Sequence, residues 1–440
     1  MIIAQTGATD VSQATASQGP VGVWEHMRGG TAFAILLAIF VTLNPFSDLG
    51  DPKVLELSSG NEAATYITLF LLVALAGLLL QLSGGLPLRL LATKENLLLL
   101  AWLLVVSVAL STDPNTSARR FVLSFAAFLL AAMLPWLTRG LRHFTNLMLV
   151  MAVLALALSY IGVLVAPHLS IHQATDMWEP EIAGDWRGVF GHKNLAASMM
   201  AVFIYVGWFV ARRGRPLIGA LVALAAFVFL LVSGGKSALG MVLIVGVVAY
   251  FVARARSIRI KALLVFGPLA VIGFLTVGSV ASETARSLLR ALAIDVTFTG
   301  RTEIWAFALD ALGAHPWKGH GFEAFWYSAA VRFGAEDSTR WMVEVATSHN
   351  SYVDLALTIG IPGLALVALA FIIVPLRDFH RTYATPENAE FSRFFLVLWL
   401  FALYLGTFEA FFLSRATPMW FILALAVCGL RYTSQFAVKD

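Results

Sequence analysis

A series of long apolar segments constrains the fold of this chain more than any other feature. An α-helix needs about 20 mostly apolar residues to cross the hydrocarbon core of a bilayer. A window of about 19 residues finds about twelve such segments in the sequence. The predicted spans are 31–48, 63–82, 96–111, 118–137, 145–165, 193–211, 217–233, 237–254, 261–279, 352–375, 393–412 and 416–431. The sequence therefore predicts an all-α polytopic integral membrane protein with about twelve transmembrane helices.

Composition agrees with a membrane protein and narrows the possible chemistry. Hydrophobic residues make up 59% of the chain and charged residues 13%, against about 45–50% and 25% in soluble domains. The single cysteine, Cys428, lies in the last apolar segment, which excludes an internal disulfide and a thiolate metal cluster. A formal net charge of +4 is small for this length and gives no reason to expect a nucleic-acid partner.

The placement of lysine and arginine predicts how the chain is oriented. With both termini on one side, the connections on that side carry about seventeen of the thirty Lys and Arg residues, whereas the short connections opposite carry about seven. Because cytoplasmic loops are enriched in positive charge, we expect both termini in the cytoplasm. Residues 1–30 have no apolar region and cleavage site of a signal peptide, so the first span is expected to remain as an anchor.

Five polar clusters fall on the outer face in this topology. They are DWRGVFGHKN (Asp185–Asn194), SGGKS (Ser233–Ser237), TGRTEIW (Thr299–Trp305), TSHNSY (Thr347–Tyr352) and SRATP (Ser414–Pro418). Each has an ordinary structural explanation, because cations at helix ends often snorkel to headgroups, and His, Asn or Gly often cap helices or form turns. Their grouping on the face that should be poor in cations favours a cationic pocket for an anionic, membrane-bound ligand.

The segment 280–348 is too long for a passive connection. Trp305, Leu309 and Leu312 at helical spacing predict an amphipathic helix over 302–312, and we expect a second helix over 338–345. Helices of this kind lie along the membrane interface and can cover a cavity. The alternative is a small solvated lid without chemistry.

The ordered motifs resemble those of the O-antigen ligase and O-antigen or exopolysaccharide polymerase superfamily. In SHNSYVDLALTIGIPG, nine residues separate His349 and Asn350 from Gly360. RGVFGHKNLAA, SGGKSALG and GRTEIWAFALDALGAHPWKGHGFEAFW precede it in the order found in that superfamily. The resemblance covers roughly residues 180–375.

This resemblance implies metal-independent, inverting transfer of a glycan from an undecaprenyl-diphosphate carrier, without a cofactor. The acceptor would be a hydroxyl of a glycan or of lipid A–core, at the periplasmic face of the bacterial inner membrane. His349 would be the general base, and Arg301 would act in catalysis by contacting the diphosphate. The other residues that the resemblance assigns to the donor diphosphate are Arg187, Lys236, His192 and Lys193. Those expected to support the site are Asn194, Asn350, Trp305 and Arg415.

The expected organisation of the chain follows from these assignments. We expect a disordered cytoplasmic tail at 1–30, nine membrane helices within 31–279 and a periplasmic catalytic loop at 280–350. Three further membrane helices are expected within 351–432, followed by a cytoplasmic tail at 433–440.

The residue types suit this chemistry. Negative charge builds on the leaving phosphate, and guanidinium groups can stabilise it in place of Mg²⁺. Histidine is largely neutral near pH 7 and can accept the proton of an acceptor hydroxyl. A metal site at Glu179, Glu181 and Asp185 is the alternative.

Other functions remain open at this stage. A transporter or flippase for polysaccharide lipids would fit the span count, but it would favour charged or broken helices near mid-membrane, whereas Asp354 and Glu409 lie near outer ends. Glu409 and Arg415 either line the cavity or pair with each other. A scaffold would not require clustered cations. GHKN resembles the polymerase form of its motif, so we expect an exopolysaccharide or O-antigen polymerase, with an O-antigen ligase as the alternative.

Overall fold

The computed structural model describes residues 21–42, 45–50, 62–83, 85, 91–176, 179–326, 328, 347–382, 385–415 and 417–438. Among these residues the regular structure is helical, and a single isolated bridge between Ile171 and Trp186 is the only β-type pairing. The first helices are α1 (Val21–Phe40), α3 (Glu62–Leu82), α4 (Lys94–Val108), α5 (Pro114–Leu137), α6 (Leu141–Val165), α7 (Pro167–Ser170), η2 (Pro180–Ile182), α8 (Lys193–Arg212) and α9 (Pro216–Val232). They are followed by α10 (Lys236–Arg254), α11 (Ile258–Leu275), α12 (Gly278–Ala281), α13 (Glu283–Ala291), α14 (Arg301–Ala314), α17 (Ser351–Ala368), η3 (Leu369–Ile373), α18 (Val374–His380), α19 (Pro386–Leu405) and α20 (Pro418–Gln435).

The expectation of an all-α polytopic membrane protein is confirmed. Each predicted span overlaps a helix, and eight helices of the described part are long and apolar enough to cross a membrane. A further apolar helix, α9, has 17 residues. The count of twelve membrane crossings stays a prediction.

Two predicted boundaries differ from the structure or fall outside it. The first helix begins at Val21 and ends at Phe40, so residues 21–30 of the predicted tail are helical. The window of apolar residues missed this extension because polar residues such as Glu25 and Arg28 also form helices. In the outer loop, α14 matches the predicted helix over 302–312, whereas the helix expected over 338–345 lies outside the described residues.

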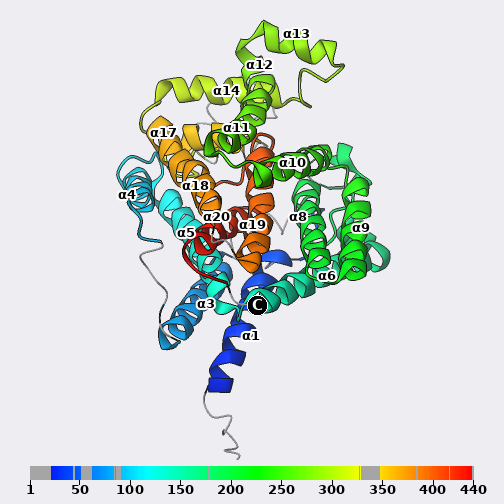
Figure 1. Cartoon of the computed structure of the whole chain (residues 1–440). Helices are drawn as coiled ribbons and strands as arrows, with labels where there is room; N and C mark the ends of the chain where they lie inside the picture. Colours follow the sequence, from blue (N-terminus) through cyan, green and yellow to red (C-terminus); the bar gives the residue numbers. More distant parts are fainter. Residues whose placement is uncertain are drawn as a thin grey trace, which may run out of the picture.

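The pair α19 and α20 forms the centre of the helix bundle. Most of their residues are buried, and α5 and α10 pack beside them. In Figure 1 the pair α8 and α9 lies on one side of this centre, and α3 and α4 lie on the other. At the closest approach of α8 and α9, a Cβ atom on Gly207 or Gly219 would lie within 2.5 Å of the other helix's backbone. Small residues thus allow tight helix packing where the membrane gives little hydrophobic driving force.

Salt bridges formed by arginine side chains connect helices at one end of the bundle. Arg212 at the end of α8 lies 2.6 Å from Glu390 at the start of α19, and Arg431 near the end of α20 lies 3.0 Å from Asp378. His192 precedes α8, so the polar cluster DWRGVFGHKN lies at the opposite end of that helix. The compartment that each end faces stays a prediction.

A break in α17 creates a docking site for the loop that follows α14. Gly360 has a φ of +73°, and Pro362 lacks the N–H that would bond to the Thr358 carbonyl. This carbonyl instead accepts a hydrogen bond from the Gly321 N–H (2.9 Å). A Cβ atom on Gly360 would lie 2.3 Å from the Trp317 carbonyl oxygen, so both the conformation and the close approach require glycine.

Candidate active site

Two side chains from separate parts of the chain, those of Arg301 and His349, meet at Glu409. Arg301, the first residue of α14, places Nη2 3.1 Å from Oε1 of Glu409 and also donates to the Phe408 carbonyl. His349 places Nδ1 3.6 Å from Oε2 of Glu409, which is longer than a hydrogen bond. The His349 side chain is 31% exposed and the other two are less so. The structure therefore brings together the two residues predicted to be catalytic; we call this group the Glu409 cluster.

The backbone around His349 is fixed by neighbouring side chains. His349 has a φ of +51°, which is uncommon for a residue other than glycine. Asn350 caps α17 by accepting two backbone N–H hydrogen bonds, and its Nδ2 donates to the Thr407 carbonyl (3.0 Å). The fully buried Trp305 donates its indole N–H to the Ser348 carbonyl (2.9 Å). Asn350 and Trp305 thus hold the turn that carries His349, and their supporting role at an active site stays a prediction.

The electrostatics of the Glu409 cluster favour an ionised carboxylate. Burial raises the pKa of Glu409, but the nearby His349 and Arg301, together with the hydrogen bond from Arg301, outweigh this effect and hold the pKa below its usual range. A carboxylate beside Nδ1 favours a proton on that nitrogen and orients the imidazole ring. Nε2 then carries the lone pair that can accept a proton.

A second group of charges, which we call the α8 cluster, surrounds the start of α8. Nζ of Lys193 lies 2.5 Å from Oδ2 of Asp185, and Nε2 of His192 lies 2.7 Å from Oε2 of Glu179. The Nδ1 atom of His192 accepts the backbone N–H of Asn194 (3.1 Å), which caps the helix. His192 and Asn194 therefore have a structural task at this helix start, and Lys193 is compensated by a carboxylate.

The turn between α9 and α10 packs against the α8 cluster. Gly234 has a φ of +67°, and a Cβ atom there would lie 2.9 Å from a carboxylate oxygen of Asp185. Lys236, the first residue of α10, is exposed, and its ammonium group has no hydrogen bond or ion pair with the described residues. The polar clusters DWRGVFGHKN and SGGKS thus meet, with Lys236 accessible to a ligand.

The pKa of Glu179 depends mainly on its pairing with His192 in the α8 cluster. Its hydrogen bond with His192 is the main cause that lowers the pKa of Glu179 to about 2, and the charges of His192, His349 and His172 act in the same direction. The charge of His349, a residue of the Glu409 cluster, thus acts on a carboxylate that belongs to the α8 cluster.

Arg187 has a different environment from the one expected for a diphosphate contact. Its side chain is fully buried, and its guanidinium group donates to the carbonyls of Ser47 (2.7 Å) and Phe190 (3.3 Å). In this conformation Arg187 fastens the DWRGVFGHKN cluster to the segment after α1. A direct contact with a diphosphate would require this packing to open.

The sequence left open whether Arg415 lines a cavity or pairs with Glu409. Arg415 pairs with Glu323 instead, so the predicted pairing with Glu409 is wrong. The Nε atom of Arg415 lies 3.6 Å from Oε2 of Glu323, and Arg120 of α5 donates to the Glu323 carbonyl. Glu323 and Arg415 line a cavity of about 240 Å³, together with Asp354.

The carboxylates considered as a metal site do not gather around one point. Glu179 and Asp185 are each paired with a basic side chain, and Glu181 is exposed. Throughout the described part of the chain, no group of three or more His, Cys, Asp or Glu side chains is placed to hold a metal ion.

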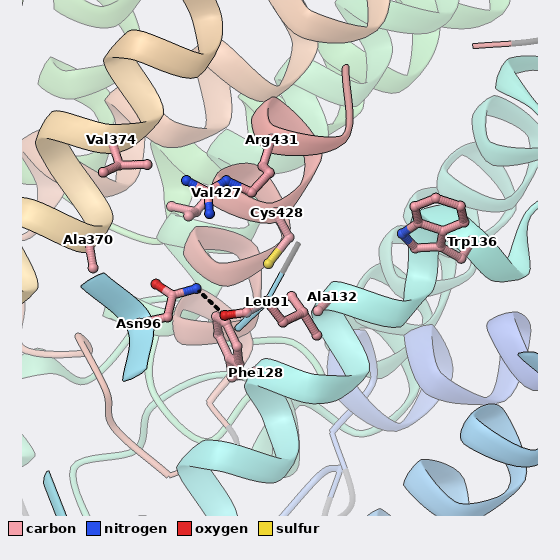
Figure 2. Close-up of a pocket in the computed structure, with 10 residues that line it drawn as sticks. All are labelled: Leu91, Asn96, Phe128, Ala132, Trp136, Ala370, Val374, Val427, Cys428 and Arg431. Carbon is pink, nitrogen blue, oxygen red and sulfur yellow. Dashed lines mark hydrogen bonds between the residues drawn. The ribbon is translucent and has the colours of Figure 1, made fainter. Parts of the chain in front are cut away.

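Two further cavities lie elsewhere in the bundle. Figure 2 shows one of about 20 Å³, room for a water molecule, beside Asn96, Cys428 and Arg431. Trp136, which lines this cavity, lies 16 residues after Arg120 in α5, or about 24 Å along the helix axis. Because Arg120 contacts Glu323, this cavity is remote from Glu323. The other is an apolar groove of about 290 Å³ between α4, α5 and α20. None of the predicted site residues lines either cavity.

Sequence reasoning did not identify the partners of Glu409, and it missed Glu323. Glu409 was visible as a carboxylate near a helix end, but its partner Arg301 is 108 residues away in the chain. Glu323 is the single acidic residue in the aromatic motif GHGFEAFW, and that isolation was the available signal. The ordinary alternative, a solvated loop carboxylate, would have been the default interpretation.

Comparison with known proteins gives two matches. Residues 221–368 match the O-antigen ligase family, a range that includes Lys236, Arg301 and His349. The "Exopolysaccharide production protein ExoQ" of Rhizobium meliloti (strain 1021) is 24% identical to this chain over 221 residues, which are 46% of this chain. The match covers 49% of the relative, so the chain spans about half the length of the curated relative that it matches.

Proposed function

The resemblance to the O-antigen ligase and polysaccharide polymerase superfamily is borne out by these matches, and from it we propose that this membrane protein is a glycosyltransferase of polysaccharide synthesis. It moves a glycan from undecaprenyl diphosphate to an acceptor hydroxyl at the periplasmic face of the inner membrane. The observation that carries the proposal is the meeting of Arg301 and His349 at Glu409.

In the proposed reaction His349 acts as the general base. Its Nε2 atom takes the proton of the acceptor hydroxyl, while Glu409 beside Nδ1 stabilises the imidazolium that forms. The acceptor oxygen attacks the anomeric carbon of the donor sugar. The bond from that carbon to the diphosphate oxygen breaks on the opposite side, so the configuration inverts. Undecaprenyl diphosphate leaves with the electron pair.

The cations of the region stabilise the leaving diphosphate. Arg301 lies beside Glu409, as His349 does. Its guanidinium group has further N–H groups besides the one that donates to Glu409. Lys236 presents an ammonium group that has no partner among the described residues, and Lys193 and His192 lie at the start of α8, where each is paired with a carboxylate in this conformation. Fixed cations in a partly enclosed site stabilise charge that develops in the transition state. This distribution of roles requires no metal ion.

We favour a polymerase over a ligase. The GHKN motif resembles the polymerase form, and the matched relative is named for exopolysaccharide production. A strain that lacks a polymerase should accumulate single repeat units on the carrier and make no long chains. If the deletion strain instead accumulates full-length polymer on the carrier, with lipid A–core or another acceptor unmodified, the protein is the ligase.

Substitution of the two central residues tests the transferase itself. We expect Arg301→Ala and His349→Ala to abolish transfer in proteoliposomes that contain the purified protein and a lipid-linked glycan. Glu303→Ala, an exposed position on the same helix as Arg301, is the matched control and should retain activity. Full activity of either central variant, at equal amounts of folded protein, would refute the assigned role.

A further inference from the structure

The cavity beside Glu323 has no task in the mechanism above. Its volume of about 240 Å³ is below the range of about 300–1,000 Å³ that is usual for drug-sized ligands, and it suits a single sugar ring. Trp326 supplies an aromatic wall, and its indole N–H donates to Oδ1 of Asp354 (3.0 Å). An aromatic surface next to carboxylate and hydroxyl groups is suited to a ring with one apolar face and several hydroxyls.

One atom in this cavity lacks a partner. Oε2 of Glu323 is buried and accepts no hydrogen bond from the described residues, and the nearest guanidinium atom, Nε of Arg415, is 3.6 Å away. Buried carboxylate oxygens are normally hydrogen-bonded, because an unpaired one loses its hydration without compensation. A ligand with hydroxyl donors would satisfy this oxygen.

The position of Glu323 is fixed from two sides. Arg120 of α5 donates to the Glu323 carbonyl, and the hydroxyl of Ser117 donates to the Phe322 carbonyl (2.9 Å). On the other side, the Gly321 N–H is bonded to the break in α17. The carboxylate therefore belongs to a preformed wall, and binding a ligand does not require this loop to become ordered.

The cavity adjoins the Glu409 cluster. Its wall includes Thr347 and Ser351, each two residues from His349, and Ala410, which follows Glu409. The hydroxyl of Ser351 donates to the Glu409 carbonyl (2.8 Å). A sugar in this cavity therefore lies beside the residue proposed to take the acceptor proton.

The charge of the cavity distinguishes between possible sugars. The described wall carries two carboxylates, Glu323 and Asp354, and one guanidinium group, that of Arg415. Burial raises the pKa of Glu323 and so lessens its negative charge, but two carboxyl groups against one guanidinium group still offer no net positive charge to a diphosphate or a carboxylated sugar. The cations suited to the diphosphate lie instead in the Glu409 and α8 clusters.

From this geometry we propose that the cavity is the subsite for one neutral sugar of the acceptor glycan. Hydroxyl groups of that sugar donate to Oε2 of Glu323, and a hydroxyl of the same residue of the glycan is presented to His349. The inference rests on the proposed transferase function, and Glu323 is in this view a residue that determines acceptor affinity.

A binding and a kinetic measurement on the full-length protein test the subsite. The probe is the benzyl glycoside of a neutral repeat oligosaccharide, which lacks a diphosphate and can act only as acceptor. The donor is the lipid-linked repeat unit. Glu323→Gln preserves the size of the side chain and removes its charge, and Glu303→Gln is the exposed control.

We expect Glu323→Gln to raise the KM for the benzyl glycoside roughly tenfold, because a charge-assisted hydrogen bond is lost. The KM for the donor should stay within about twofold of the wild-type value. The preference for the neutral glycoside over one with a uronic acid should also fall. Because Glu323→Gln could disturb folding, Ser414→Ala provides a milder change in the same wall, with an expected rise of about threefold in acceptor KM.

The outcomes separate this inference from the proposed function. An unchanged acceptor KM in both variants, or a rise in donor KM alone, overturns the acceptor subsite while the activity of the wild type still supports a transferase. If the wild type binds the benzyl glycoside and Glu323→Gln weakens that binding, the sugar subsite stands even when no transfer is detected. A uniform loss of folded protein without a change in KM also contradicts the subsite.

Discussion

Replacement of Glu409 by glutamine tests whether this carboxylate orients and stabilises the general base. Glutamine keeps the size of the side chain and an oxygen that can accept from Arg301, but it removes the negative charge 3.6 Å from Nδ1 of His349. The substitution should raise the free energy of the transition state more than that of the ground state, because the imidazole ring becomes positively charged in the transition state.

The magnitude follows from the distance and the exposure of the pair. At 3.6 Å two unit charges interact by about 4–5 kcal/mol at an effective dielectric constant of about 20. The side chains of His349 and Glu409 are 31% and 18% exposed, so solvent screening reduces the expected effect to roughly 2–3 kcal/mol. This corresponds to a fall of about 30- to 150-fold in kcat.

The assay is the steady-state rate of transfer in proteoliposomes, with Glu303→Gln as the control and the amount of folded protein measured by size-exclusion chromatography. A kcat within about threefold of the wild type would refute the role of Glu409 in catalysis. A lower thermal stability with unchanged kcat would show that the carboxylate only fastens α14 to the segment after α19.

The same variant has a defined effect on stability at low pH. The folded-state pKa of Glu409 is held below its unfolded value, so the ionised carboxylate contributes stability above the unfolded pKa of about 4.3. This contribution is lost as the pH falls through the folded-state pKa. The stability advantage of the wild type over Glu409→Gln should therefore shrink as the pH falls below about 4.3, as measured by thermal unfolding.

Three other variants or conditions give separate tests. Arg187→Ala should destabilise the protein by about 2 kcal/mol or more, because two carbonyls lose buried donors, and should therefore reduce the folded fraction in size-exclusion chromatography; normal folding with loss of transfer alone would favour a diphosphate contact. Gly360→Ala should cost about 1–3 kcal/mol, because a φ of +73° with a ψ of +172° is a conformation essentially restricted to glycine, plus the clash with Trp317, and an unchanged unfolding temperature would contradict this. Excess EDTA should leave transfer unchanged, and activity lost on chelation but restored by Mg²⁺ or Mn²⁺ would revive a metal site at Glu179, Glu181 and Asp185.

The sequence by itself determined where helices form and which polar clusters are candidates for the site. Apolar segments long enough to cross a bilayer predict helices because an unpaired backbone is so costly in lipid, and the predicted spans overlap helices throughout the described part of the chain. The uneven distribution of lysine and arginine also predicts an orientation in which the polar clusters share one face, and that orientation stays a prediction. These properties are local or additive along the chain, so they can be predicted without knowing which helices are neighbours.

Only the tertiary structure decided the partners of the charged residues. Arg301 and His349 meet at Glu409 because the start of α14, the turn before α17 and the segment after α19 come together, and no spacing in the sequence encodes that meeting. Burial likewise separated two arginines that look equivalent in the sequence, since Arg187 is enclosed by carbonyls whereas Arg301 is partly exposed beside a candidate base. The free energy of a charge depends on its desolvation and on the distance to its partner, and both are set by packing between segments far apart in the chain.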